Sequence, residues 1–356
     1  MSSSVLICSA SILTADGRIA NVGDEALTEC LATALRRRVP GLDVTATLNL
    51  AGHPRSVLPP GRVSPRPIRE LWRAIVVADV VVVGGGTLLQ EDVRPRPYEP
   101  VAGLLRYVLA VVVLARVRRR PVVIVGVGAE NLGSRRARLA ARVICRSAAS
   151  VSARDEESAQ LLASLSGAPA STAADPLFLD DAPAARGACG PGAILVNVRA
   201  DAPSGLLERL AELLARELDQ GRRVVLVPMD RRSGHDDRAL ARLVALVGRP
   251  ERFTTIGAES SWREVLAAFT DAELCVGMRL HFLIFGVLAG ARVVALTSSE
   301  KTVSFAHELG LSACAIDEPD ALPAAVEAAR RPDFSAVDSL SRRAEAALDP
   351  VVALCA

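Results

Sequence analysis

Aromatic residues are scarce in this sequence. Phe, Trp and Tyr together make up 3% of the 356 residues. So few rings argue against a protein that binds nucleic acid by stacking bases, and against a sugar site lined by many aromatic side chains. An excess of charge is also missing, because 42 basic residues face 40 acidic ones and the net charge is +2. The sequence therefore indicates no nucleic-acid partner and no strong overall field.

Paired cysteines are absent as well. The seven cysteines are scattered without a CxxC pair, and several lie in apolar stretches, where a thiol behaves as a small hydrophobic side chain. An odd, dispersed set in a chain of this length predicts reduced thiols and a cytoplasmic protein. His53, His235 and His307 have no neighbours at metal-ligand spacing, so the sequence predicts neither a metal site nor a resident cofactor.

No apolar run is long enough to cross a bilayer. The first apolar run has no basic residues before it and predicts a buried strand rather than a signal peptide. Residues 101–115 are apolar apart from Arg106 and Tyr107, and a basic RVRRR segment follows. We interpret this run as a core helix that ends in a basic turn. A peripheral helix that contacts a membrane surface is the alternative.

Apolar residues are abundant, at 50% of the chain, and they recur in an alternating pattern of continuous strands and helices. That pattern is typical of parallel sheets covered by helices on both faces. A stretch rich in Ala, Pro and Gly at residues 180–192 reads as a linker. We therefore predict an α/β fold with two Rossmann-like domains facing a cleft, residues 1–182 and residues 190–356, the second carrying the C-terminal helices.

Several chemically notable loops follow the predicted strands, where ligands bind in such folds. Gly84, Gly85 and Gly86 let backbone approach a ligand closely, and Thr87 is a candidate cap for a following helix. The turn lacks the GxGxxG and GxxxxGK patterns, so it predicts neither dinucleotide binding nor a Walker-type phosphate site. Plain turn formation is the alternative reading of these glycines.

Acidic residues open two of the predicted helices. Asp24, after Gly23, is explained by capping and dipole pairing, but Asn21 and Asp24 are also candidates to bind sugar hydroxyls or to act as a base. Capping explains the acids after Arg154 equally well. It does not explain Arg154 itself, because a cation at a helix start is unfavourable unless an anion faces it.

The strongest local pattern lies in residues 271–296. A short strand breaks at Gly277, and Arg279 and His281 then open an apolar helix. A helix N-terminus favours negative charge, and Arg can hold a carboxylate or phosphate with two hydrogen bonds. His281 can donate a proton near neutral pH. The alternative is a buried structural pair that backbone carbonyls satisfy.

Six motifs occur in a fixed order along the chain: NVGDEAL at 21–27, GGGTLLQ at 84–90, VGVG at 125–128, SARDEES at 152–158, DPLFL at 175–179 and VGMRLHFLIFGVLAG at 276–290. With this ordered set the chain resembles the polysaccharide pyruvyl transferases, most closely the bacterial branch that modifies cell-wall polymers. The MRLH motif before an apolar helix is the most specific of them. The resemblance covers roughly residues 1–320.

The resemblance implies a glycosyltransferase-B-like architecture and a role in polysaccharide biosynthesis. It implies transfer of the enolpyruvyl unit of phosphoenolpyruvate to two sugar hydroxyls, which gives a cyclic ketal and phosphate. His281, Arg279 and Arg154 would be the catalytic residues. The substrate-binding residues would be Asn21, Asp24, Gly84, Gly85, Gly86, Thr87, Gly128, Leu280 and Lys301. The acceptor would lie toward the first domain.

One stretch departs from the family pattern. Many relatives carry a Ser-Tyr-Asp-x-Lys type loop after the second strand, whereas residues 297–301 read TSSEK, so that Lys301 matches and the Tyr and Asp do not. An acceptor that is a specialised small metabolite therefore stays open. A nucleotide-sugar glycosyltransferase with Glu300 near the nucleotide, and a non-catalytic ligand-binding descendant, are alternatives. A lipid-linked acceptor and a homo-oligomer also stay open.

Overall fold

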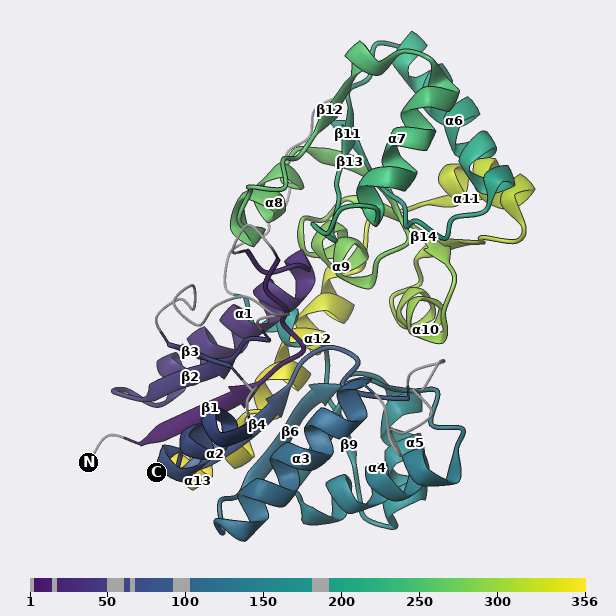
Figure 1. Cartoon of the computed structure of the whole chain (residues 1–356). Coiled ribbons are helices and arrows are strands. Elements are labelled where there is room, and N and C mark those ends of the chain that lie inside the picture. Colours follow the sequence, from purple (N-terminus) through teal and green to yellow (C-terminus); the bar gives the residue numbers. More distant parts are fainter. Residues whose placement is uncertain (1–2, 15–17, 50–60, 65–67, 92–102, 181–191) are drawn as a thin grey trace. The chain divides into compact units, whose positions relative to one another are not determined.

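The computed structural model describes residues 3–14, 18–49, 61–64, 68–91, 103–180 and 192–356 (Figure 1). The chain divides into two compact units. Unit 1 comprises Met1–Ile19, Asp24–Asp180 and Ser339–Ala356, and unit 2 comprises Ala20–Gly23 and Asp181–Asp338. The sequence places residues 20–23 in the first domain and residues 339–356 in the second, so the division differs from the predicted boundaries at both places.

Unit 1 is built on a parallel seven-stranded sheet with the order β3-β2-β1-β4-β6-β8-β9. Its strands are β1 (Ser4–Cys8), β2 (Asp43–Thr47), β3 (Arg62–Val63), β4 (Val80–Gly84), β6 (Val122–Val127), β8 (Ser150–Ala153) and β9 (Ser171–Thr172). All five residues of β4 are buried. Both faces of the sheet are therefore covered, as continuous apolar runs predict.

Helices cover the two faces of this sheet in an order set by the direction of the connections. They are α1 (Val22–Arg38), α2 (Ile68–Val77), α3 (Gly103–Val117), α4 (Arg135–Ser147) and α5 (Glu156–Ser166). The connection from β1 to β2 runs opposite to those from β3 to β9, and right-handed crossovers therefore place α1 on one face and α2 to α5 on the other. Leu6, Val81 and Val83 share one buried cluster with residues of α2 to α5.

The C-terminal helices complete unit 1 on the side of α1. They are α12 (Phe334–Ala346), whose residues from Ser339 onward belong to unit 1, and α13 (Asp349–Cys355). Arg38 at the end of α1 donates to the backbone oxygen of Glu345 at 2.8 Å and to the carboxylate of Asp349 at 2.6 Å. Ser3 Oγ donates to the backbone oxygen of Cys355 at 2.8 Å.

Unit 2 holds a parallel six-stranded sheet with the order β12-β11-β10-β13-β14-β15. The strands are β10 (Ala193–Asn197), β11 (Val224–Leu226), β12 (Phe253–Thr255), β13 (Ala272–Gly277), β14 (Arg292–Thr297) and β15 (Ser312–Ala315). The helices are α6 (Ser204–Asp219), α7 (Asp236–Val247), α8 (Trp262–Ala268), α9 (Leu280–Leu288), α10 (Glu300–Glu308) and α11 (Leu322–Ala328). Ile194, Val196, Leu274 and Val276 form a buried cluster with α6, α7 and α11.

Among the described residues, no helix has the length and apolar character needed to span a bilayer.

Candidate functional site

The predicted strand, glycine break and helix are present in unit 2. β13 ends at Gly277 and α9 begins at Leu280, with Arg279 as its extended N-terminal flanking residue. Only glycine fits at the break, because a Cβ at Gly277 would lie 2.3 Å from Cδ1 of Phe282. Close packing against the ring of Phe282 therefore requires glycine at this turn. The turn places Arg279 and His281 at the start of a buried helix.

Two carboxylates hold Arg279. Its Nη2 donates to Asp236 Oδ1 at 2.6 Å and lies 3.3 Å from Asp230 Oδ2, and its Nε lies 3.2 Å from both oxygens of Asp236. Both aspartate side chains are fully buried, whereas 23% of the Arg279 side chain is exposed. Arg279 thus pairs with carboxylates and not with the backbone carbonyls of the alternative reading, and this pairing fixes the guanidinium plane.

Asp236 is itself fixed by several donors. Its Oδ2 accepts hydrogen bonds from the backbone N–H groups of Met229 and Asp230 and from Asn197 Nδ2, at 3.1–3.2 Å. Asn197, which ends β10, also accepts from the backbone N–H of Arg279 at 3.1 Å. The carboxyl ends of three neighbouring segments are therefore tied together around one buried carboxylate.

The second carboxylate, Asp230, binds two arginines. Burial raises its pKa, but the hydrogen bonds and charge of Arg232 and the charge of Arg279 outweigh burial, so the pKa of Asp230 lies below its usual range. Asp230 is therefore ionised at neutral pH. The two aspartates and the two arginines balance in formal charge, and any further anion must draw on additional donors nearby.

His281 lies against the start of α1. A Cβ on Gly23 would lie 1.8 Å from Nδ1 and 2.2 Å from Cγ of His281. The imidazole thus occupies the space that any side chain at position 23 would need, and Gly23 is required where the sequence predicted only helix capping. Nε2 of His281 is shielded from solvent.

Backbone hydrogen bonds within unit 2 hold residues 20–23, which belong to that unit. Val22 N donates to Met229 O at 2.9 Å, and Arg231 N donates to Ala20 O at 2.7 Å. Asn21 pairs with Asp230 in an antiparallel bridge, and its Oδ1 accepts from Gly23 N at 2.8 Å. The side chain of Asn21 therefore orders the turn that faces His281.

Arg154 has a corresponding position in unit 1, after β8. Its side chain is 5% exposed and pairs with Glu130 at 3.3 Å and Asp155 at 3.1 Å. The anions that face Arg154 are thus the carboxylates of Glu130 and Asp155. Gly128 is required here, because a Cβ at that position would lie 2.6 Å from Nη2 of Arg154.

Asp175 lies in the same region, at the start of a short helical turn, Pro176–Leu179. Burial raises the pKa of Asp175 to about 6, although the charge of Arg154 and a hydrogen bond from Leu177 N act in the opposite direction. Gly126, with φ +58°, is needed beside it, because a Cβ would lie 2.7 Å from the backbone oxygen of Ala174.

The triple-glycine turn ends β4. Gly85 and Gly86 have φ of +75° and +71°, a region that favours glycine. Asp24 lies beside the turn, with Oδ1 3.9 Å from the Cβ position of Gly86. The expectation that Thr87 caps a helix is wrong, because the next element is β5 (Leu89–Gln90), which pairs in parallel with β7 (Ala129–Glu130). This pairing joins the glycine turn to the segment that carries Gly128.

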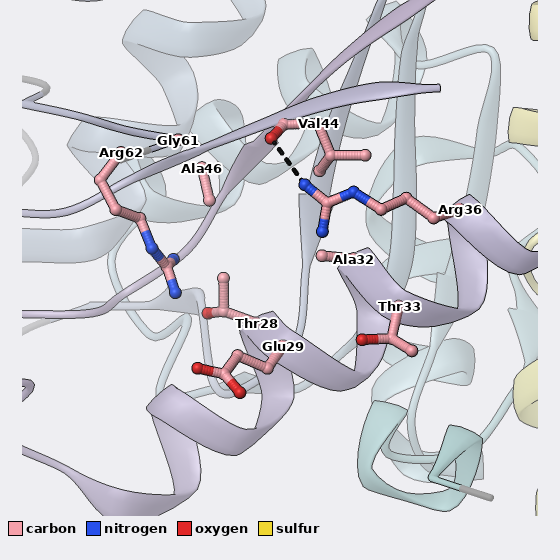
Figure 2. A pocket seen from close by; sticks show the side chains of 9 residues that line it. All are labelled: Thr28, Glu29, Ala32, Thr33, Arg36, Val44, Ala46, Gly61 and Arg62. Carbon is pink, nitrogen blue, oxygen red and sulfur yellow. Dashed lines mark hydrogen bonds between the residues drawn. The ribbon is translucent and has the colours of Figure 1, made fainter. Parts of the chain in front are cut away.

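A cavity of about 250 Å³ opens between α1 and the β2–β3 edge of unit 1 (Figure 2). Its ionic and hydroxyl groups come from Thr28, Glu29, Thr33, Arg36 and Arg62. Arg36 donates to the backbone oxygen of Val44 at 3.2 Å. Nη1 of Arg62 is buried and makes no hydrogen bond with any described residue. Burial lowers the pKa of Arg62, against the charges of Glu29 and Glu25.

The predicted site residues thus fall into one group per unit. Unit 2 holds Asn21, Arg279, Leu280, His281 and Lys301, and unit 1 holds Asp24, Gly84, Gly85, Gly86, Thr87, Gly128 and Arg154. Leu280 is buried in the core, and Lys301 lies in the first turn of α10 rather than in a loop.

Sequence reasoning missed Asp230, Asp236, Asn197, Glu130 and Asp175, which hold the two arginines or lie beside them. The described residues include no group of three His, Cys, Asp or Glu side chains suited to a metal ion.

The two parallel α/β units define a glycosyltransferase-B-like fold, and solved structures share it. UDP-GlcNAc 2-epimerase from Neisseria meningitidis, bound to UDP-GlcNAc, is 11% identical with a TM-score of 0.56, over 99% of each chain. The enzyme from Methanocaldococcus jannaschii is 13% identical with a TM-score of 0.60, over 96% of this chain and 99% of its own. Anabaena HepE, in complex with UDP and glucose, is 13% identical with a TM-score of 0.53, over 99% of this chain and 97% of its own.

The sequence assigns the chain more narrowly. The profile of the polysaccharide pyruvyl transferase family matches residues 21–300. The chain belongs to this family, as its ordered motifs predict, and a sugar or glycan is therefore its class of acceptor. A search of curated proteins found no match.

Proposed function

We propose that this protein transfers the pyruvyl unit of phosphoenolpyruvate onto two hydroxyls of a sugar-containing acceptor. The observation that carries the proposal is the pair of Arg279 and His281 at the start of α9, with Arg279 fixed by Asp236. Membership in the pyruvyl transferase family supports the same reaction. We place the reaction in cytoplasmic synthesis of a cell-wall polysaccharide, with phosphoenolpyruvate as a substrate and no resident cofactor.

The chemistry assigns His281 as the acid. Protonated His281 donates a proton to the methylene carbon of phosphoenolpyruvate, and positive charge develops at C2. One sugar hydroxyl adds to C2 and returns its proton to the base form of His281. The second hydroxyl then displaces phosphate from C2 and passes its proton to the departing phosphate, so that the products are a methyl-bearing cyclic ketal and inorganic phosphate.

Arg279 anchors the donor in this proposal. Its side chain is 23% exposed, and because the two aspartates hold Nε and Nη2, we assign Nη1 to a carboxylate or phosphate oxygen of the donor. Because Asp230 and Asp236 already balance Arg232 and Arg279, the positive end of α9 and protonated His281 supply the remaining attraction. Leu280 contributes its backbone, and Lys301 remains a proposed donor-site cation. Arg154 as a phosphate ligand stays a prediction, since Glu130 and Asp155 already occupy its guanidinium.

The acceptor is assigned to unit 1. Asp24 and the glycine turn lie together there, and the cavity of Figure 2 begins one turn further along α1, at Thr28. One turn of four residues is about 6 Å of helix, roughly the length of a sugar ring. A volume of about 250 Å³ accommodates one monosaccharide unit. A buried guanidinium nitrogen without a hydrogen bond is costly, so we assign Nη1 of Arg62 to an acidic substituent on that unit.

One assay tests the reaction. The protein is incubated with phosphoenolpyruvate and a panel of neutral and acidic sugars, and phosphate release and product mass are followed. The expected product is heavier than the acceptor by one pyruvate less one water. Hexose transfer from a nucleotide sugar, without phosphate release from phosphoenolpyruvate, would instead establish a glycosyltransferase and refute the proposal. Arg62→Gln should raise KM for acidic acceptors and leave KM for neutral ones unchanged.

A further inference from the structure

Large apolar side chains are exposed on one layer of unit 1. Nine such side chains are exposed among the described residues, and six of them lie on α2, α3 and α4. They are Ile68, Val77, Val113, Val117, Leu139 and Val143, with exposed fractions from 38% to 71%. Single exposed apolar residues are ordinary, but a concentration on neighbouring helices indicates an interaction surface.

Most of the charged residues in α3, α4 and the segment between them are basic. Residues 103–147 contain ten arginines and a single acidic residue, Glu130, which pairs with Arg154. The whole chain has a net charge of only +2, so this segment is basic against a balanced background. Eight of the ten arginines are exposed: Arg116, Arg118, Arg119, Arg135, Arg136, Arg138, Arg142 and Arg146.

The apolar and basic residues alternate on one solvent face of α4. Arg138, Leu139, Arg142, Val143 and Arg146 follow one another at helical spacing and are all exposed, whereas the opposite face of α4 is buried. α3 contacts both α2 and α4, and Figure 1 shows α3 and α4 lying along the same side of the sheet. We call this surface of α2, α3 and α4 the α2–α4 face.

We infer that the α2–α4 face binds the surface of an anionic lipid bilayer. Arginines attract anionic headgroups, and Leu and Val between them enter the boundary between headgroups and acyl chains. A nucleic acid would use the arginines but would leave these aliphatic side chains without a partner. Arg118 also lies 5.5 Å from the ring centroid of Trp72 on α2, a residue type favoured at membrane interfaces. The inference stands independently of the proposed reaction.

The test is co-sedimentation of the full chain with vesicles of phosphatidylcholine alone and of phosphatidylcholine mixed with anionic phosphatidylglycerol. We expect binding only to the mixed vesicles, and weaker binding at high salt because exposed charges are screened. A double variant of α4, Arg142→Glu with Leu139→Ser, should bind at least roughly five-fold more weakly, since each basic residue near the surface contributes about five-fold.

A matched control places the same changes in unit 2. Arg216→Glu on α6 with Leu246→Ser on α7 alters an exposed arginine and an exposed leucine, and it should bind the vesicles like the unchanged protein. If the α4 variant does not fold, Arg116→Glu with Val117→Ser on α3 replaces it. Equal binding by the α4 variant and the control, equal binding to neutral vesicles, or displacement by short duplex DNA would each overturn the inference.

Discussion

Arg154 in unit 1 and Arg279 in unit 2 occupy corresponding places, each at the end of a parallel strand and each between two carboxylates. Their exposure is opposite. Around Arg279 the acids are fully buried and 23% of the arginine is exposed, whereas Arg154 is 5% exposed and its acids are each 13% exposed. Two similar ion-pair groups thus leave the arginine partly exposed in unit 2 and bury it in unit 1.

This difference separates two uses of a buried ion pair. Gly128 lies against the guanidinium of Arg154, which suits a residue that holds residues 128–130 and 154–155 of unit 1 together. Buried Asp236 and Asp230 instead hold an Arg279 that stays partly exposed, which suits a residue that meets an anion. Chemistry should therefore belong to the Arg279 group alone.

The largest effect is expected from His281→Ala. Loss of a general acid typically lowers kcat by about 10²–10⁴-fold. Phosphate release from phosphoenolpyruvate measures the loss, and circular dichroism checks the fold. His307→Ala on α10, where the histidine is exposed, should leave kcat unchanged. A His281→Ala protein with normal turnover would exclude His281 as the proton donor.

Replacing each arginine by methionine compares the two groups directly. Arg279→Met leaves two fully buried aspartates without their shared cation, and breaking a buried pair typically costs roughly 3–5 kcal/mol. Arg154→Met should cost less, because Glu130 and Asp155 keep some contact with water. Urea unfolding gives both values.

Binding of phosphoenolpyruvate by the same two variants, measured by calorimetry, separates ligand contact from stability. Arg279→Met should weaken binding and Arg154→Met should not. Equal weakening by both would restore Arg154 as a donor ligand, as the sequence predicts, and would remove the distinction between the two groups.

Gly23→Ala should lower kcat because it displaces the ring of His281 without removing it. The new methyl group overlaps the ring of His281, so the ring must move. A displacement of about 1 Å can lower kcat by about 100-fold, with little change in KM for phosphoenolpyruvate. Gly133→Ala is the control, since no atom lies within 4 Å of its Cβ position. Unchanged kcat in Gly23→Ala, or an unchanged imidazole NMR signal, would show that the contact does not position His281.

Asp175 and Asp230 should give opposite pH dependences of stability. Because the pKa of Asp175 is raised from 3.8 to about 6, the folded state retains a proton that the unfolded state loses, and stability falls as pH rises through this interval. Asp175→Asn should remove that fall, which is on the order of 2–3 kcal/mol.

The pKa of Asp230 is lowered below 3.8, so its stabilisation is present above this pH and is lost as pH falls through the lowered pKa. Thermal unfolding of wild type, Asp175→Asn and Asp230→Asn from acidic to neutral pH measures both. The same slope in Asp175→Asn and in wild type would show that Asp175 does not titrate there.

Much of the fold follows from sequence pattern. Continuous runs such as residues 80–84 predict strands buried on both faces, and the glycine that ends β13 predicts the break before Arg279. Strands of two residues, such as β5 and β7, are too short to produce a pattern, which is why Thr87 was expected before a helix. Helical spacing predicts the last helices but not which sheet they cover.

The partners of the arginines were beyond sequence reasoning for a physical reason. Asp236 lies 43 positions before Arg279, and an acid at the start of α7 is fully explained by capping and the helix dipole. Gly23 looked like an ordinary helix start for the same reason. Only the packing of the sheet ends brings these residues to Arg279 and His281.

The hydrogen bond from Ser3 to Cys355 has a consequence for how the chain assembles. Ser3 and Cys355 both lie in unit 1, and the last residues of unit 2 precede those of α13, so unit 2 can be completed first during synthesis. Unit 1, although begun first, gains its final helix only when residue 355 has been made.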